Sequence, residues 1–472
     1  MPRHAAANSW YEVIISGAGN DIKASPTYRS DADKILTTGD GLRPICRNCI
    51  KANRNCLGAD GGLKFVIHTN DQSLVQQNRN PQNQQPSHSP PPILAGLENK
   101  PQGEQELDAL VAANPRAALA NLEIAEIFRH YIDVLAPWYD LCDSEHLFGN
   151  TVPLRALENS TLFRAIIAFS GYHRSKISGY GPVIGLAFHA ACVKDLLKVV
   201  DNFQLGLRGD YLAATCLLRS YEILIGDSRK QQQHLLGAYL FSSNEPLDMS
   251  HSGLAQAGAW NYLREEITVA LECNRPVRLG FEFHFDPSKS YTDSMRANIM
   301  SHLLARTINH CFHEPEDGLV NEARQQSWQD LQREVSAWKA NLPASFEPFS
   351  KAVKEENPFP SLWLVHPWHV AAQQYCSIAE ILLAIYDPFS PIDREFVLEQ
   401  TLNVCGLAYT NDNVAARVNV FGPLAYCGKY LQTTRHRQGL MSMLREFALP
   451  TAWPVGCIIE DLERCWSLHH EA

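Results

Sequence analysis

"NLEIAEIFRHYIDVLAPWY", residues 121–139, carries the pattern that decides the fold class of this chain. Its apolar residues recur at steps of three and four, and they are Ile124, Ile127, Phe128, Tyr131 and Leu135. Because an α-helix turns once every ~3.6 residues, these steps place the side chains on one helical face. Pro137 is predicted to end the helix, since proline lacks the backbone N–H that the next turn needs.

The same period returns in two later stretches of the chain. In "STLFRAIIAFSGYH", residues 160–173, the apolar face consists of Leu162, Ala165, Ile166 and Phe169. In "QYCSIAEILLAIYDP", residues 374–388, it consists of Tyr375, Ile378, Leu382 and Ile385, and the pattern stops at Pro388. Strand-like alternation is nearly absent, and its best candidate is "FEFHF" at 281–285. We therefore expect an all-α fold with about a dozen helices over 118–468, packed as one large domain.

The composition fits a soluble intracellular protein with a sizeable core. The chain has 472 residues, is 45% hydrophobic and carries a net charge of -10. No apolar run approaches the ~18 residues of a membrane helix, so no membrane partner is expected. Ten of its 13 cysteines are scattered through apolar surroundings, as Cys216 is in "LAATCLLRSYEIL". Free cysteine packs as a small hydrophobic residue, so these ten are expected to be reduced and mostly buried.

The charge is unevenly distributed along the chain. Residues 43–68 contain one acidic residue, Asp60, and five basic residues, which are Arg43, Arg47, Lys51, Arg54 and Lys64. This segment therefore carries +4, and the rest of the chain carries -14. A small basic module joined to a large acidic body indicates nucleic-acid contact by one part only.

Four segments follow from these differences in composition. Residues 1–42 form an atypical N-terminal segment that we expect to be disordered, and residues 43–68 form the basic module. Residues 69–116 are expected to be a flexible linker, because Gln, Asn and Pro make up 19 of the 37 residues from 69 to 105. Such a stretch buries too little apolar surface to offset its ordering entropy. The helical domain is expected over 117–470.

The basic module contains three cysteines that are candidate metal ligands. In "PICRNCIKANRNCLG", residues 44–58, they are Cys46, Cys49 and Cys56, spaced C-x2-C-x6-C. Three thiolates at this spacing are able to bind one Zn²⁺, which leaves its fourth position open for a residue such as His68. The alternative is a chance cluster. Against it, this polar part of the chain offers no core in which cysteines would be buried.

This stretch resembles the second half of the fungal six-cysteine binuclear zinc cluster. Pro44 matches the loop proline, Lys51 is typical of that half, and the fourth, fifth and sixth cysteines are matched by Cys46, Cys49 and Cys56. The helical region is similar to the fungal-specific transcription factor domain. The stretches that carry this similarity are "LAPWYDLCDSEHLF", "LAATCLLRSYEIL", "HLLGA", "ALECNRPVRL" and "WLVHPWHVAAQQYC".

The resemblance implies a zinc-dependent, DNA-binding regulator of RNA polymerase II transcription that acts in the nucleus. Its expected partners are promoter DNA with CGG half-sites, the transcription machinery and a second copy of the chain, although no heptad run supports a coiled-coil homodimer. Arg47, Lys51 and Arg54 are the candidate DNA-binding residues, suited mostly to phosphate contact.

The chain departs from the family pattern before Cys46. The first half of the cluster should end near 33–40, but "DKILTTGD" stands there and contains no cysteine. The base-reading lysines of that half are missing with it. Either the start or splicing of the gene model is mis-assigned, or the chain is a variant that has lost its specific reader. In the second case it would be a helical regulatory or interaction protein without specific DNA binding.

Two further groups of residues have metal-like spacing and are better explained as structural. His310, Cys311, His313 and Glu314 in "NHCFHEPE" point in different directions around a helix end. His366 and His369 in "HPWH" lie one turn apart but have no third donor at a supporting spacing, and the nearby Trp363 and Trp368 are expected in the core.

An enzyme is not expected. The chain has no G-x-S-x-G elbow, P-loop or H-E-x-x-H motif. The stretch "YEVIISGAG" opens like a dinucleotide-binding turn, but Ile22 stands where the third glycine should be.

Overall fold

The computed structural model describes residues 102–179, 183–200, 209–226, 249, 252–278, 283, 286, 288–313 and 321–468. All of them belong to one compact unit, Leu97–Ala472. The predicted segments 1–42 and 43–68, and the linker as far as residue 101, lie outside the described residues. So does most of the strand candidate at 281–285.

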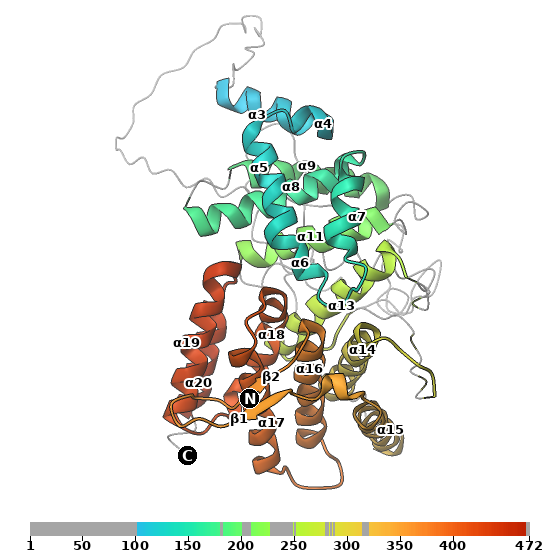
Figure 1. Ribbon diagram of the computed structural model, residues 1–472, viewed down its shortest axis with the longest axis vertical. Coiled ribbons are helices and arrows are strands. Elements are labelled where there is room, and N and C mark those ends of the chain that lie inside the picture. The colour runs from blue at the N-terminus through green and yellow to red at the C-terminus, as the bar shows by residue number, and fades with distance from the viewer. Residues whose placement is uncertain are drawn as a thin grey trace, which may run out of the picture. The chain divides into compact units, whose positions relative to one another are not determined.

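The first group of helices surrounds α8 (Figure 1). Helix α8 packs against α5, α7, α9 and α11, while α3 lies on α9. The elements of this group are α3 (Gln102–Ala112), α4 (Pro115–Ala118), α5 (Leu122–His130), the π-helical η2 (Tyr131–Leu135), α6 (Ala136–Tyr139), α7 (Leu147–Ala156), α8 (Ser160–Ser178), α9 (Val183–Val200) and α11 (Gly209–Ile225).

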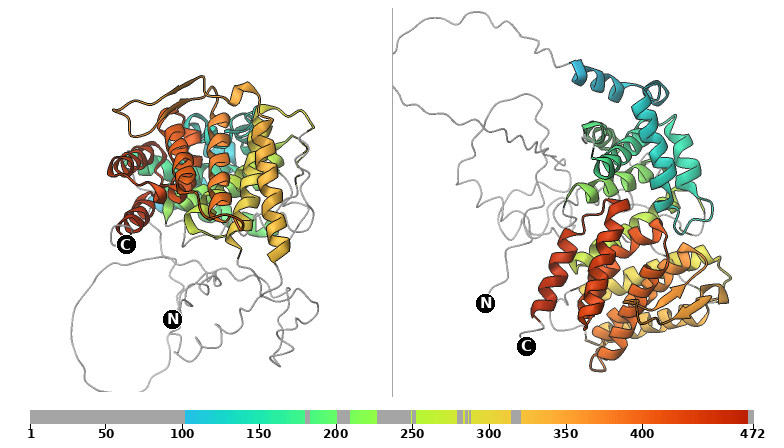
Figure 2. Two further views of the ribbon diagram at one scale, coloured as in Figure 1. Left: turned by 90° about the horizontal axis from the view of Figure 1, so that it is seen from below. Right: turned by 60° about the vertical axis from the view of Figure 1, so that its left-hand side comes forward.

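The second group surrounds α16, which packs against α14, α15, α17 and α18. The views in Figure 2 show α18, α19 and α20 along one side of this group. Its elements are α14 (Asp293–Phe312), α15 (Asn321–Ala340), η3 (Ala344–Phe346), α16 (Pro367–Ile385), α17 (Arg394–Thr410), α18 (Val414–Cys427), η4 (Gly428–Tyr430), α19 (Thr434–Thr451) and α20 (Gly456–Leu468).

Helix α13 (Leu254–Cys273) joins the two groups, because it packs against α7 and α11 of the first and against α14 and α18 of the second. Within the described ranges the only strands are β1 (Ser350–Ala352) and β2 (Ser361–Trp363), which form an antiparallel pair with Lys351 opposite Leu362. The all-α prediction is confirmed.

Side-chain caps start many of these helices. Asn121 accepts hydrogen bonds from the backbone N–H groups of Glu123 and Ile124 at the start of α5, and Asn159 does the same for α8. Asp393, Asn413 and Thr433 cap α17, α18 and α19 in the same way. These residue types favour helix starts because their oxygens bind N–H groups that have no partner inside the helix.

The predicted apolar faces are confirmed. All five face residues of the 121–139 stretch are buried, as are the four of the 160–173 stretch, and of the third face only Ile385 is partly exposed. The predicted end at Pro137 is wrong, because η2 leads directly into α6. The N–H of Ala136 bonds to the carbonyl of Tyr131, five residues back, so Pro137 falls in the first turn of α6 where no N–H is needed.

The linker prediction over 69–116 is wrong at its C-terminal end. Residues 102–112 form α3, which lies against α9, and its Leu107 and Leu110 pack against the core. The helical part of the chain therefore begins at least as early as residue 102 rather than at 117. The Gln, Asn and Pro content that indicated a linker was counted over 69–105 and so ends inside α3, whose second half, 107–112, is mostly apolar.

All ten scattered cysteines are free, and seven of them are buried. Trp368 is partly buried, but Trp363 is 45% exposed, so its predicted place in the core is wrong. Trp363 lies on β2, where alternate side chains face opposite ways. Leu362 and Leu364 face inward, and Trp363 faces outward against Phe349. None of the helices in the described ranges combines the length and hydropathy that spanning a membrane requires.

The contact between α13 and α18 generates a prediction. A Cβ atom at Gly422 would lie 2.6 Å from the Cα atom of Thr268 and 2.7 Å from its carbonyl oxygen. Gly422→Ala is therefore expected to lower the free energy of unfolding by about 1–3 kcal/mol, because backbone atoms cannot move aside cheaply. Urea unfolding measures the change. The matched control is Gly456→Ala, whose added Cβ meets no atom within 4 Å. An equal loss in both variants would contradict close packing as the cause.

Candidate functional site

Helix α13 places three consecutive charged residues, Arg264, Glu265 and Glu266, inside the protein. Arg264 is 2% exposed and Glu266 is not exposed at all. The helix is covered on several sides by α7, α11, α14 and α18, so Arg264 and Glu266 are shielded from bulk water, whereas the Glu265 side chain is 14% exposed. A buried charge is tolerated only where it is paired and hydrogen-bonded. We call the resulting set of contacts the α13 network.

Glu266 is the most heavily bonded member of the α13 network. Its Oε1 accepts from Arg219 Nη2 at 3.1 Å and from Arg275 Nη2 at 3.2 Å. Its Oε2 accepts from Arg275 Nη1 at 3.2 Å and from the backbone N–H of Arg278 at 2.8 Å. Burial by itself raises the pKa of Glu266, but Arg219, Arg275 and these hydrogen bonds outweigh it, and the pKa lies below its ordinary value. Glu266 is therefore held ionised.

The turn after α13 brings two of these partners back to the helix. Asn274 ends α13 in the left-handed conformation, with φ 49°, and the N–H of Arg275 bonds to the carbonyl of Ala270. Asparagine is one of the few residues other than glycine that adopts this conformation readily. The local sequence "NRPVR" thereby directs Arg275 and the backbone of Arg278 at Glu266.

Arg219 ties α11 to α13. Its side chain is 2% exposed, and besides Glu266 it donates from Nη1 to the carbonyl of Tyr262 at 3.2 Å. The guanidinium carbon lies 4.7 Å from the centre of the Tyr262 ring, within the range of a cation–π contact. Three kinds of contact therefore hold one arginine in place.

Glu265 lies next to Glu266 in the sequence but in a different environment. Its Oε1 accepts from Ser220 Oγ at 2.8 Å, and Ser220 Oγ accepts from Tyr139 Oη at 2.6 Å. Its Oε2 lies 3.6 Å from Arg219 Nη1 and accepts no hydrogen bond from the described residues. Burial raises the pKa of Glu265 to about 7, although Arg219 and the Ser220 hydrogen bond oppose that rise. Adjacent carboxyl groups thus ionise in different pH ranges.

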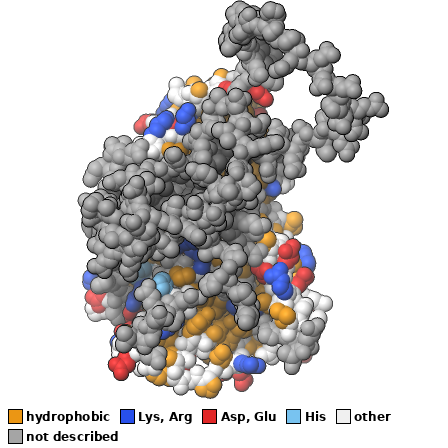
Figure 3. Space-filling model, turned by 180° about the vertical axis from the view of Figure 1, so that it is seen from behind, with side chains coloured by type: hydrophobic (Ala, Val, Ile, Leu, Met, Phe, Trp, Pro, Cys, Tyr) orange, Lys and Arg blue, Asp and Glu red, His pale blue; other side chains and the backbone are white. Residues whose placement is uncertain are grey.

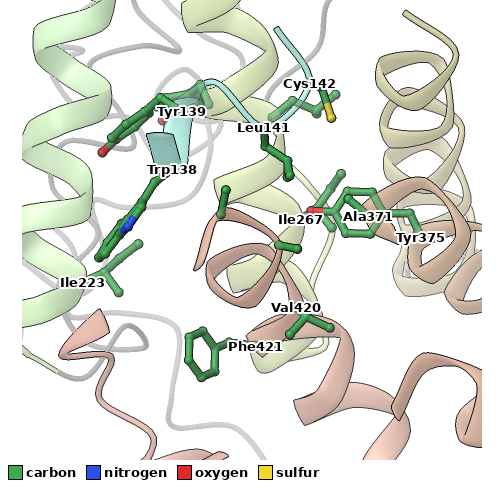
Figure 4. Close-up of a cluster of buried hydrophobic side chains, with 14 of the residues drawn as sticks. Trp138, Tyr139, Leu141, Cys142, Ile223, Ile267, Ala371, Tyr375, Val420 and Phe421 are labelled. Carbon is green, nitrogen blue, oxygen red and sulfur yellow. The ribbon is translucent and has the colours of Figure 1, made fainter. Parts of the chain in front are cut away.

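Arg264 links α13 to the loop that follows α6. It donates to Asn298 Oδ1 at 2.7 Å and to Asn261 Oδ1 at 2.8 Å. These asparagines in turn donate to the carbonyls of Cys142 and Tyr139, at 3.3 and 2.9 Å. Figure 4 shows Leu141 and Cys142 of this loop on the side of Ile267 of α13 and Tyr375 of α16, with Tyr139, the last residue of α6, further away.

The same loop starts α7. Asp140 accepts from the backbone N–H groups of Phe148 and Gly149, both at 2.9 Å, and Asp143 accepts from those of Glu145 and Leu147. Burial raises the pKa of Asp140 to about 6, against these hydrogen bonds. The stretch "WYDLCDSEHLF" is thus a capping segment whose backbone is held by the α13 network.

This arrangement fixes helices in position. Burial raises the pKa of the Cys142 and Cys216 thiols that lie among these residues, so neither is a ready nucleophile. The ion pairs join α11, α13, the turn after α13 and, through the asparagines, the loop before α7. The α13 network is therefore a site at which the two groups of helices are coupled.

The sequence-predicted metal ligands and DNA-contacting residues lie outside the described residues. These are Cys46, Cys49, Cys56 and the suggested His68, with Arg47, Lys51 and Arg54. Among the residues that the structure describes, no group of three His, Cys, Asp or Glu side chains is placed to hold a metal ion.

The two weaker metal candidates have separate surroundings. Cys311 is buried beside the carbonyl of Leu382, whereas His310 faces Ser327, and Glu314 is outside the described residues. His369 is buried and its Nε2 lies 2.9 Å from Asp293 Oδ2, whereas the exposed His366 stacks on Trp368. Both groups are parts of the packing, as the sequence suggested.

Sequence reasoning missed the α13 network. A signal was present: Arg219 interrupts the apolar run "LAATCLLRSYEIL", and the acidic pair stands in the similar run "WNYLREEITVALE". A charge in the middle of an apolar helix requires a partner of opposite charge. The sequence does not identify the partner of Arg219, because Glu266 lies 47 positions further along the chain.

The two glutamates generate a paired prediction. Because the pKa of Glu265 is raised from 4.5 to about 7, its ionisation opposes folding, and wild-type stability should fall as pH rises through that range. Glu265→Gln cannot ionise, so its stability relative to wild type should increase between about pH 5.5 and about pH 8, by roughly 2 kcal/mol. Thermal unfolding at both pH values measures this.

The matched variant Glu266→Gln should behave in the opposite way. It leaves Arg219 and Arg275 without their carboxylate and is expected to cost about 3–5 kcal/mol at neutral pH. Similar stability of the two variants at neutral pH would contradict the different ionisation of the two side chains.

Comparison with known proteins bears on the same region. Residues 126–261 match the family model of the fungal specific transcription factor domain. The chain is also similar to the transcription activator AMTR1 of Alternaria alternata, with 22% identity over 176 residues. That similarity covers 32% of this chain and 23% of the length of AMTR1. No solved structure matches.

The α13 network begins with Tyr139 and Arg219 inside the matched region and continues past its end at residue 261. Together, the matched domain and this relative support a regulator of transcription.

Proposed function

We propose that this chain is a nuclear, zinc-dependent regulator of transcription by RNA polymerase II. The observation that carries the proposal is the match of residues 126–261 to a transcription factor domain, in a region whose helices are joined by the α13 network. In this proposal the helical part, 102–468, is the regulatory domain and the basic module, 43–68, contacts promoter DNA. The same family match favours a protein that is not an enzyme.

The metal in this proposal is held by Cys46, Cys49 and Cys56. Three thiolates with one further ligand fit a single tetrahedral Zn²⁺, but they do not fit a bridged pair of zinc ions, which needs six. Zinc would supply folding energy to the module rather than chemistry. Arg47, Lys51 and Arg54 would then contact phosphates, and CGG half-sites, a homodimer and the transcription machinery are the proposed partners.

A second candidate function is favoured by one observation. No cysteine stands in residues 1–45, so the first half of a two-zinc cluster is missing from this sequence. The chain would then act through its helical domain on partner proteins, without choosing DNA sequences itself. Zinc content and DNA selectivity distinguish the two candidates.

The first prediction of the proposal concerns zinc. Native mass spectrometry of the full chain is expected to find one bound Zn²⁺ at most, since three thiolates cannot bridge two ions. Replacing Cys49 with Ser should abolish this binding, whereas Cys216→Ser, in the helical core, should leave it unchanged. Two zinc ions per chain would show that other ligands complete the cluster.

The second prediction concerns DNA. The full chain is expected to bind duplexes weakly and with little preference between a CGG site and a scrambled one. Each phosphate contact contributes about -0.9 to the slope of log K against log salt concentration. Lys51→Ala should therefore weaken binding to both duplexes equally and reduce the slope by about one. Competition binding at two salt concentrations measures both. Strong preference for the CGG duplex would mean that the base-reading residues lie elsewhere in the chain.

A further inference from the structure

The β1–β2 hairpin has one strand edge without a partner. Strand β2 lies between β1 and the end of α17, where Thr410 Oγ1 accepts a hydrogen bond from the backbone N–H of Leu362 at 3.1 Å. Asn411 accepts from the N–H of Leu364 at 3.2 Å and donates to the carbonyl of Leu362 at 2.8 Å. On the other side, no element in the described part of the chain pairs with β1. The backbone N–H and carbonyl groups along that edge are therefore available to an added strand.

The hairpin is held in place although it lies at the surface. Figure 1 shows the two strands beside α17, against which β2 packs. Leu362 of β2 and Leu364 directly after it are buried. The loop between the strands is tied to α19 by Arg435, which donates to the carbonyl of Asn357 at 2.8 Å. A strand edge that is already ordered loses little conformational entropy when a partner binds.

Large apolar side chains are exposed along the hairpin. Phe349, directly before β1, is 67% exposed, and Val353, directly after β1, is 85% exposed. Trp363 of β2, which lies opposite Ser350, is 45% exposed, and its ring contacts that of Phe349. Side chains of this kind beside a free edge provide apolar contacts for a strand that is added there.

The charges along β1 have a symmetrical order. Lys351 is the middle residue of the strand, and Glu347 precedes it. The turn after the strand contains Lys354, Glu355 and Glu356, so that end carries one net negative charge. All five side chains are exposed, and none forms an ion pair within the described part of the chain. The edge therefore presents a positive centre between two negative ends.

We infer that the free edge of β1 binds an extended segment of a partner protein, with one acidic residue at its centre, apolar residues on either side and a basic residue at each end. The acidic residue would pair with Lys351, the apolar residues would contact Phe349 and Val353, and the basic residues would meet the negative ends of the edge. Backbone hydrogen bonds give such an added strand its affinity, and its side chains give specificity. Opposite charges facing each other across two strands are stabilising, and like charges are destabilising.

The same charges disfavour other occupants of this edge. A second copy of the chain, paired antiparallel about Lys351, would place lysine opposite lysine and Glu347 opposite the negative turn. Nucleic acid phosphates would be repelled at both ends. On the face seen from behind, exposed hydrophobic side chains lie among Lys, Arg, Asp and Glu side chains (Figure 3), and the described ranges contain no strand edge besides those of the hairpin. The inference does not depend on DNA binding by the basic module.

The test uses the full chain and the fluorescein-labelled peptide Lys-Thr-Val-Thr-Glu-Thr-Val-Thr-Lys, followed by fluorescence anisotropy. The matched peptide Glu-Thr-Val-Thr-Lys-Thr-Val-Thr-Lys has the same composition and net charge, but its acidic residue is at one end. We expect the first peptide to bind and the second to bind at least about fivefold more weakly. A version of the first peptide with every backbone amide N-methylated keeps the side chains and lacks N–H donors, so it should bind at least about tenfold more weakly.

Two variants of the chain have matched controls. Lys351→Glu should weaken binding of the first peptide about fivefold or more, whereas Lys194→Glu, at an exposed lysine of α9, should change it by less than about twofold. Phe349→Ser should weaken binding about threefold or more, whereas Leu154→Ser, at an equally exposed residue of α7, should have no effect.

Equal losses in a variant and its control, or equal binding of the two peptides of the same composition, would overturn the assignment. So would undiminished binding of the N-methylated peptide, or no binding of any peptide. Self-association that Lys351→Glu abolishes would also overturn it, since this would identify a second copy of the chain as the occupant.

Discussion

The carboxylate of Glu266 imposes the strongest constraint on this fold. It lies on a helix that neighbouring helices enclose, and its pKa is lowered, so it remains charged in the interior. An unpaired charge there would cost several kcal/mol. Arg219 from α11 and Arg275 from the turn after α13 must therefore both reach it. The hydrogen bonds and ion pairs that the Glu266 carboxylate requires therefore fix the position of α11 and of the turn after α13.

The contacts of Arg264 extend this constraint to the second group of helices. Arg264 is held by two asparagines, one on its own helix and one, Asn298, on α14. Both asparagines also hold carbonyls of the loop that caps α7. The contact of Gly422 with Thr268 brings α18 against α13 one turn after Arg264. Because all these contacts meet on one helix, a change at α13 would be felt in both groups.

The buried ion pairs of the α13 network contribute more clearly to the arrangement of the helices than to stability. Stability alone does not require buried ion pairs, since apolar residues of similar volume often serve as well or better. What the pairs supply is a defined arrangement of α11, α13 and the loop after α6. The pKa of Glu265 is raised to about 7, whereas the pKa of the neighbouring Glu266 is lowered, so the two carboxyl groups respond differently to pH. The matched transcription factor domain contains part of this network.

The sequence by itself determined the helical class and the buried faces. Periodicity is a local property, so the faces of the 121–139 and 160–173 stretches could be derived from residue spacing alone. The caps at Asn121 and Asn159 are local for the same reason. The sequence also placed three cysteines and a basic module before the helical domain, and these remain predictions.

Only the tertiary structure decided which residues meet. Arg219 and Glu266 are far apart in the chain, and no pattern within either stretch names the other as its partner. The helix continues past Pro137 because a π-helical turn precedes it. Trp363 faces outward because it lies on a strand, β2, which forms by pairing with β1. The helix at 102–112 begins with polar residues like those of the preceding segment, and only its contact with α9 places it in the helical domain. Local spacing determines what a segment can form, whereas burial against distant segments determines which charges must pair.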